Sequence, residues 1–139
     1  MIDPVSATSL AVELTAICIK AVKLLKQTIE TMKKAREDLL ELLNRTERMR
    51  NILEVLRTLL LELARKPHRD MAIGLNTDAC RRTMNELQSL ADKIAGTKLA
   101  HPLLGVVQWA RYKGEAMELV AKLRSQETDV VNTLVIIGV

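Results

Sequence analysis

Hydrophobic and polar positions recur with helical spacing in the first half of the chain. Between residues 37 and 65 every third or fourth residue is apolar or a threonine, and charged residues such as Arg45, Arg48 and Glu54 lie between them. This spacing keeps one face of a helix apolar over about four heptads. It predicts a helix over 37–65 whose buried face is formed by Leu39, Leu42, Thr46, Met49, Leu53, Leu56, Leu60 and Leu63.

An apolar stretch without glycine or proline, residues 5–25, precedes this helix. Asp3 and Pro4 predict where it begins, because aspartate is a favoured N-cap and proline a favoured first helical residue. The helical spacing continues through both segments and also fits a single helix of about 60 residues, roughly 90 Å long. A lone helix of that length needs a partner, whereas two packed helices need only each other. We therefore predict a hairpin with its turn in the polar run 31–38.

A third helix is predicted after a connecting segment. Pro67 and Gly74 mark residues 65–78 as this connection. Asn76 or Thr77 then serves as the N-cap. The apolar face of the helix comprises Cys80, Met84, Leu87, Leu90, Ala91 and Ile94, and Gly96 is expected to end it as a C′ residue.

The last helical region begins near Pro102, after a link containing His101. Gly114 is a weak point within it, since glycine costs a helix about 1 kcal/mol relative to alanine. The apolar positions of this region are Trp109, Ala116, Val120, Leu123, Val130, Leu134 and Ile137. The sequence ends on the apolar run VVNTLVIIGV. We therefore expect that this sequence is a piece of a longer protein.

The composition favours an all-α fold. Hydrophobic residues make up 48% of the chain, yet it has one Trp, one Tyr, no Phe, five Gly and three Pro. Sheet proteins use more aromatic residues and more turn signals than this. A chain of 139 residues is long enough for one domain with its own core. We predict a single domain over 1–139, an up-and-down bundle of four or five helices.

Candidate catalytic and metal-binding residues are sparse. His68 and His101 each stand beside a proline, with no Cys or His at ligand spacing. Ser6 and Ser9 lack the G-x-S-x-G context of a nucleophile, and no glycine-rich phosphate loop is present. Carboxylates such as Glu41 are mixed with basic residues, which is typical of a solvated surface. We expect no enzymatic activity, no metal and no cofactor.

The charge pattern bears on partners and location. A net charge of +4 favours anionic surfaces, but nucleic-acid binding needs a denser basic patch and more aromatic residues than this chain has. Cys18 and Cys80 lie in apolar helical patterns and are expected as buried free thiols in the cytosol. Glu13, Lys20 and Lys23 interrupt the opening stretch, so we expect no transmembrane span.

The opening stretch itself allows two interpretations. Its apolar residues surround most of a helix, which is typical either of a helix buried in a core or of one that enters membranes. Four-helix bundles routinely bury one helix on several sides, and this favours the core interpretation on physical grounds alone.

Four segments, taken in order, are similar to a known family. They are MIDPVSATSLAVELTAICIKAVKLL, LLELLNRTERMRNILEVLRTLL, CRRTMNELQSLADKI and VVQWARYKGEAMELVAKLRSQETDVVNTL. Their order and spacing resemble the N-terminal domains of fungal NLR-type receptors, the HeLo and HeLo-like (HELL, SesA) group. One departure concerns the first helix, which is glycine-rich in that group. Here its small residues are Ser6, Ala7, Ser9, Ala11, Ala16 and Ala21.

The resemblance implies a cytoplasmic cell-death effector or signalling domain placed before a nucleotide-binding module. On self-association, its first helix would move to the plasma membrane and meet anionic lipids. The implied membrane-active residues are Val5, Leu10, Leu14, Ile17, Val22 and Leu25, with Lys20, Lys23 and Lys26 as headgroup contacts. The competing hypothesis is an adaptor bundle for protein–protein interaction, whose first helix never leaves the core.

Overall fold

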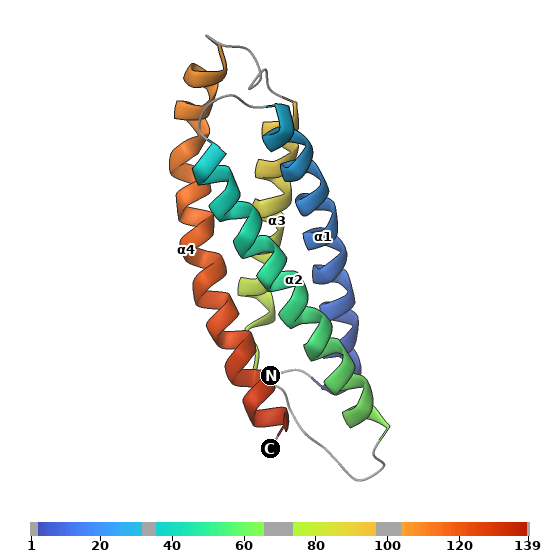
Figure 1. Ribbon diagram of the computed structural model, residues 1–139. Coiled ribbons are helices and arrows are strands. Elements are labelled where there is room, and N and C mark those ends of the chain that lie inside the picture. The colour runs from blue at the N-terminus through green and yellow to red at the C-terminus, as the bar shows by residue number, and fades with distance from the viewer. Residues whose placement is uncertain (1–2, 32–35, 66–73, 97–103, 139) are drawn as a thin grey trace.

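A computed structural model of the chain describes residues 3–31, 36–65, 74–96 and 104–138. These residues form four helices and no strand: α1 (Pro4–Thr31), α2 (Arg36–Ala64), α3 (Thr77–Ala95) and α4 (Leu104–Gly138). Successive helices run in opposite directions (Figure 1), so the predicted all-α up-and-down bundle is confirmed. The predicted hairpin is also present, because α1 and α2 are separate helices that pack against each other. Residues 32–35 of its expected turn lie outside the described residues.

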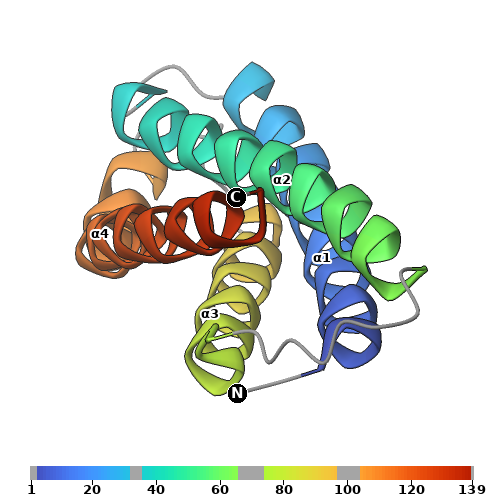
Figure 2. The ribbon, with the colours of Figure 1, turned by 90° about the horizontal axis from the view of Figure 1, so that it is seen from below.

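The chain does not place its helices around the bundle in sequence order. Helix α1 contacts α2 and α3, and α4 contacts the same two helices from the other side. Within the described ranges, no Cα atoms of the diagonal pairs α1–α4 and α2–α3 lie within 8 Å of each other. The view along the bundle in Figure 2 shows the resulting order α1, α2, α4, α3. Consequently α2 and α4 are parallel neighbours, whereas α1 and α2 are antiparallel.

The first helix begins where the sequence predicts. The backbone N–H of Ser6 donates to Asp3 Oδ1 at 2.9 Å, and the Ser6 hydroxyl donates to Asp3 Oδ2 at 2.7 Å. These bonds favour the ionised carboxylate and hold the pKa of Asp3 below its usual value. Asp3 is thus the N-cap of α1.

The ends of α3 confirm one expectation and correct another. Asn76, not Thr77, is the N-cap, since its side-chain oxygen accepts a hydrogen bond from the Ala79 N–H at 3.1 Å. Gly96 follows the helix with φ −83° and ψ 0°, and its N–H donates to the Asp92 carbonyl at 3.1 Å. This is right-handed helical geometry, not the left-handed C′ geometry expected from the glycine. Gly96 therefore stands at the predicted position but does not use its conformational freedom.

The core runs the length of the bundle between the four helices. All eight seam positions of α2 are buried, as is the apolar face predicted for α3. Trp109 is 5% exposed, and its indole N–H has no hydrogen-bond partner among the residues described. The predicted bundle-core residues are all buried: Leu39, Leu42, Met49, Leu53, Leu56, Leu60, Leu63, Leu87, Trp109 and Leu123.

Helix α4 passes through Gly114 without interruption. Apart from its chain neighbours and the adjacent backbone of α4, a Cβ atom added at this glycine would meet no atom within 4 Å. The expected weak point therefore neither ends nor divides the helix. Of the other expected markers, Pro67 and Pro102 lie outside the described residues.

Candidate functional site

The inner face of α1 forms one wall of the core. It carries Ala7, Leu10, Ala11, Leu14, Cys18, Ala21, Val22, Leu25 and Ile29, each at most 7% exposed. Among the residues implied to be membrane-active, Leu10, Leu14, Val22 and Leu25 therefore point into the bundle. Ile17 is partly buried against the core, and Val5 is 65% exposed. The resting structure thus divides this set between the core and the surface.

A second row of apolar and small residues follows the outer face of α1. Val5, Ser9, Val12, Ala16 and Ile19 are all exposed, at alternating spacings of four and three residues. Val12 is 47% exposed and Ile19 is 49% exposed. Because solvent-facing helix positions are usually polar, this row makes α1 unusual for a surface helix.

The described part of the chain has one helix that is long and apolar enough to cross a membrane. It is Pro4–Glu30, with a mean hydropathy of 1.6 in its most apolar window, of which 44% is buried inside the bundle. Core helices of soluble proteins have the same length and composition. Glu13, Lys20 and Lys23 interrupt the uncharged run, yet a window with at most two charges keeps this hydropathy, so length and composition alone do not decide between a core helix and a membrane helix.

The three lysines implied to contact headgroups lie on the second half of α1, and all three are exposed. Lys26 forms an ion pair with Glu47 of α2, with Nζ 3.3 Å from the carboxylate. Lys20 and Lys23 have no ion-pair partner among the described residues. A further ion pair joins Glu13 to Arg81 of α3 at 3.6 Å. Exposed ion pairs of this kind each contribute about 0–1 kcal/mol to the free energy of unfolding.

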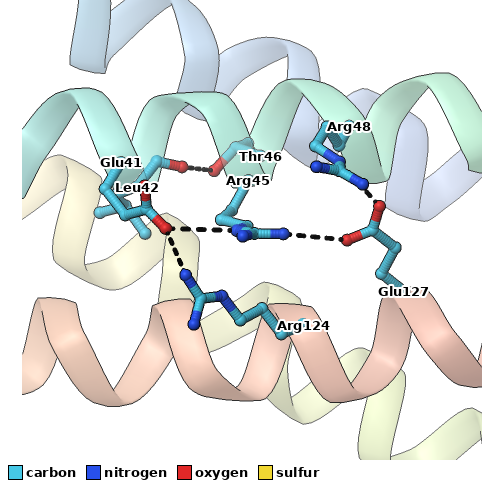
Figure 3. A network of polar contacts seen from close by, with 7 residues as sticks. All are labelled: Glu41, Leu42, Arg45, Thr46, Arg48, Arg124 and Glu127. Carbon is cyan, nitrogen blue, oxygen red and sulfur yellow. Dashed lines mark hydrogen bonds and ion pairs between the residues drawn. The ribbon is translucent and has the colours of Figure 1, made fainter.

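The polar contacts between α2 and α4 form a continuous network (Figure 3). Arg48 Nε donates to Glu127 at 2.8 Å, and Arg45 Nη1 lies 3.5 Å from the other Glu127 oxygen. Glu41 accepts from Arg124 at 2.8 Å and from Arg45 at 3.4 Å. The bonds from Arg124 and Arg45 hold the pKa of Glu41 below its usual value. Alternating charges therefore link the two parallel helices without interruption.

Helix α4 is also bonded to α3. The buried Gln126 donates from Nε2 to the Ala79 carbonyl at 2.8 Å and to the Thr83 hydroxyl at 2.6 Å. Its Oε1 is buried and has no partner within the described ranges. Lys122 donates to Glu86 at 2.8 Å on the surface of the same seam. Helix α4 thus makes direct polar contacts with both of its neighbours.

The two cysteines are buried free thiols. Cys18 Sγ lies 3.6 Å from Met84 Sδ in the core. Burial raises the pKa of Cys18 to about 12, although Arg50 opposes this rise. Burial, with a smaller contribution from Asp129, raises the pKa of Cys80 to about 11. Thiols that stay protonated in this way are poor nucleophiles and poor metal ligands.

A shallow groove opens on the outer side of the α1–α2 seam. It has a volume of about 300 Å³ and is lined by Val12, Thr15, Ala16, Ile19, Glu54 and Arg57. Glu54 and Arg57 are exposed, and neither side chain has an ion-pair partner in the described part of the chain.

The α2–α4 network and the α1–α2 groove were not predicted from the sequence. Glu41 was interpreted as a solvated carboxylate, and Glu54 only as a charge between the buried positions of its helix. Opposite charges three or four residues apart, as in Glu41–Arg45 and Glu54–Arg57, were the available signal. Such spacing cannot reveal which helix lies opposite, so the α4 partners could not be found this way.

No group of three or more His, Cys, Asp or Glu residues that could hold a metal ion is found among the residues the structure describes. His68 and His101 lie outside them.

Comparison with known proteins yields one family. The profile described as "Pigment biosynthesis cluster protein PigL N-terminal" matches residues 2–129, which include α1, α2, α3 and most of α4. No curated protein and no solved structure matches the chain.

Proposed function

The chain belongs to the family of pigment biosynthesis cluster protein PigL N-terminal domains, and from this premise we propose that it is a cell-death effector or signalling domain of a fungal immune-type receptor. The chain is a fungal N-terminal helical domain with an apolar first helix. The proposed mechanism is self-association, followed by release of α1 toward the plasma membrane. Similarity of the four sequence segments to the HeLo-like group supports this finer assignment.

Unequal attachment of the helices is the observation that carries the proposal. Among the described residues, two exposed ion pairs join α1 to its neighbours, and its other contacts with them are largely apolar. By contrast, α4 is joined to α2 by the network around Glu127 and to α3 by the buried Gln126. Among the bonds between described residues, α1 therefore has the fewest polar bonds to its neighbours.

This difference matters because apolar contacts can be exchanged for lipid. Acyl chains replace the apolar surroundings of a helix, whereas they cannot replace the ion pairs and hydrogen bonds of α2–α4. Release would expose Leu10, Leu14 and Leu25, so α1 stays in the bundle until another apolar environment is available. Clustering of several copies at a membrane supplies that environment and shifts the population toward the released state.

Lys20 and Lys23 would then interact with anionic headgroups, together with Lys26 once its pair with Glu47 is broken. A nucleotide-binding module elsewhere in the full-length protein would drive the clustering. The domain would accordingly move from the cytoplasm to the plasma membrane on activation.

Dye release from vesicles tests the proposal. The chain carries a C-terminal histidine tag and is clustered on phosphatidylserine vesicles that contain a nickel-chelating lipid. Val12→Glu combined with Ile19→Glu changes two half-exposed positions, so the bundle should still fold. Each charge placed deep in the bilayer costs about 2.5–3.5 kcal/mol on insertion scales. We expect the wild type to release dye and this variant to lose most of that activity.

Val55→Glu is the matched control, because Val55 is 51% exposed on α2 and should not enter the membrane. It should release dye as the wild type does. Vesicles of phosphatidylcholine with the chelating lipid test the role of the lysines and should leak less. Equal release by the wild type and the α1 variant, with both proteins folded, would show that α1 stays in the core. The adaptor hypothesis would then stand.

A further inference from the structure

We propose that the groove between α1 and α2 binds a second copy of this chain, so that two resting molecules form a two-fold symmetric dimer. The groove holds about 300 Å³, with an apolar wall from α1 and charged side chains from α2. This dimer forms in solution and requires neither a membrane nor release of α1. It is distinct from the release of α1, because Ile19 belongs to both surfaces whereas Glu54 and Arg57 belong to the dimer contact alone.

The shape of the α1 wall suits a copy of itself. Ile19 is 49% exposed, and the small Ala16 lies almost one turn before it on the same face. A two-fold axis that passes through the groove at right angles to the helices makes the two α1 helices antiparallel. Ile19 then packs against the partner's Ala16, and the reverse contact follows from symmetry. Both half-exposed isoleucines are covered in one step.

The charges on the α2 wall are complementary in the same arrangement. Glu54 and Arg57 lie three residues apart on one face and lack ion-pair partners within the described residues. Further along the same α1–α2 seam, Lys26 and Glu47 do pair. The two-fold axis reverses the order of the charges in the second copy, so Glu54 faces the partner's Arg57 and Arg57 faces the partner's Glu54.

A second copy therefore supplies a partner for Ile19, Glu54 and Arg57 of the groove. One symmetric contact supplies an apolar knob, a small residue to receive it, and two ion pairs. An unrelated partner would need the same acid, base and apolar side chain at the same spacing. The groove is small, so the dimer should be weak and concentration-dependent.

Analytical ultracentrifugation of the chain without lipid tests the dimer. At concentrations up to about 1 mM, the apparent mass should rise from 15.6 kDa toward twice that value. Glu54→Arg leaves two basic residues in the groove and Arg57→Glu leaves two acidic ones. We expect each variant alone to bind itself at least about tenfold more weakly than the wild type, a change of 1.4 kcal/mol.

An equimolar mixture of these two variants should restore association, because the basic groove of one matches the acidic groove of the other. The double variant Glu54→Arg with Arg57→Glu should also dimerise. Ile19→Lys removes the apolar knob and should weaken the dimer independently of the charge changes. The control is Glu118→Arg on the exposed surface of α4, which should leave the association unchanged.

Circular dichroism confirms that each variant is folded before its mass is measured. A wild type that remains monomeric up to about 1 mM would overturn the proposal. So would single charge variants that associate as strongly as the wild type, or a mixture that fails to restore association. Since these measurements contain no vesicles, loss of the dimer and loss of dye release are distinguishable results.

Discussion

Glu127 on α4 accepts a hydrogen bond from the Nε of Arg48 on α2 at 2.8 Å, although 79 residues separate them in sequence. The Glu127 side chain is only 15% exposed, so its charge is partly shielded from water and depends on its arginine partners. The contact joins two parallel helices that the chain itself does not connect directly. It therefore stabilises an arrangement that no short loop enforces.

Glu127→Gln should weaken the bundle by about 1–2 kcal/mol, because Arg48 loses its charged partner and Arg45 keeps only its pair with Glu41. Urea denaturation measures this change, and added salt should reduce the difference from the wild type. Glu118→Gln, at an exposed position of the same helix, should change stability by less than about 0.5 kcal/mol. Equal midpoints for the wild type and the Glu127 variant would contradict the structural role of the network.

Leu53→Asp or Leu56→Asp should unfold the domain. Both leucines are 1% exposed on the seam of α2, and an unpaired charge there costs roughly 3–5 kcal/mol. Val55→Asp provides the comparison, since Val55 is 51% exposed between them and should tolerate the same charge. Thermal melts followed by circular dichroism distinguish these cases. Cooperative melting of the leucine variants near the wild-type temperature would show that the seam is not buried.

Gly114→Ala should stabilise the protein by about 1 kcal/mol, because alanine costs less entropy in a helix than glycine. The added methyl group meets no atom within 4 Å beyond the adjacent backbone of α4, so no clash with another part of the bundle opposes this gain. Ala121→Gly, at another exposed position of α4, should destabilise by a similar amount. Denaturant midpoints measure both changes. A Gly114→Ala variant no more stable than the wild type would indicate that α4 is not continuous at this residue.

Alkaline pH should reduce stability through the buried thiols. The pKa is about 12 for Cys18 and about 11 for Cys80, above the ordinary value of 9.0. Above pH 9 the unfolded chain therefore loses these protons first, and unfolding becomes easier. The stability that the two protonated thiols contribute is complete below about pH 9 and is lost as the pH rises through 11 and 12.

Cys18→Ala combined with Cys80→Ala should show a shallower loss of stability between pH 9 and 11 than the wild type. Because both cysteines are buried, the folded wild type should also react slowly with a thiol reagent at pH 8. Rapid labelling of the folded protein would show that the thiols are accessible to solvent.

The sequence alone determined the helices and their buried faces. The spacing of leucines in α2 and of apolar residues in α3 identified core positions, because a helical face repeats every three to four residues whatever packs against it. The caps at Asp3 and Asn76 were also predictable, since capping is a local interaction between a side chain and the next turn of backbone. Gly96 shows the limit of such signals. A glycine permits the left-handed conformation but does not require it.

The tertiary structure alone decided which helices are neighbours, and with them the candidate sites. Alternating charges on α2 fit a solvated surface as well as a network, until Glu127 and Arg124 of α4 are placed beside them. The groove at Glu54 and Arg57 likewise exists only because α1 lies against that part of α2. An apolar helix can have the same composition in a protein core and in a membrane. Only the packing of α1 therefore shows that it buries Leu10, Leu14 and Leu25. The same packing leaves Val12 and Ile19 exposed. Contacts between distant segments depend on the order of the helices around the bundle, and helical periodicity carries no information about that order.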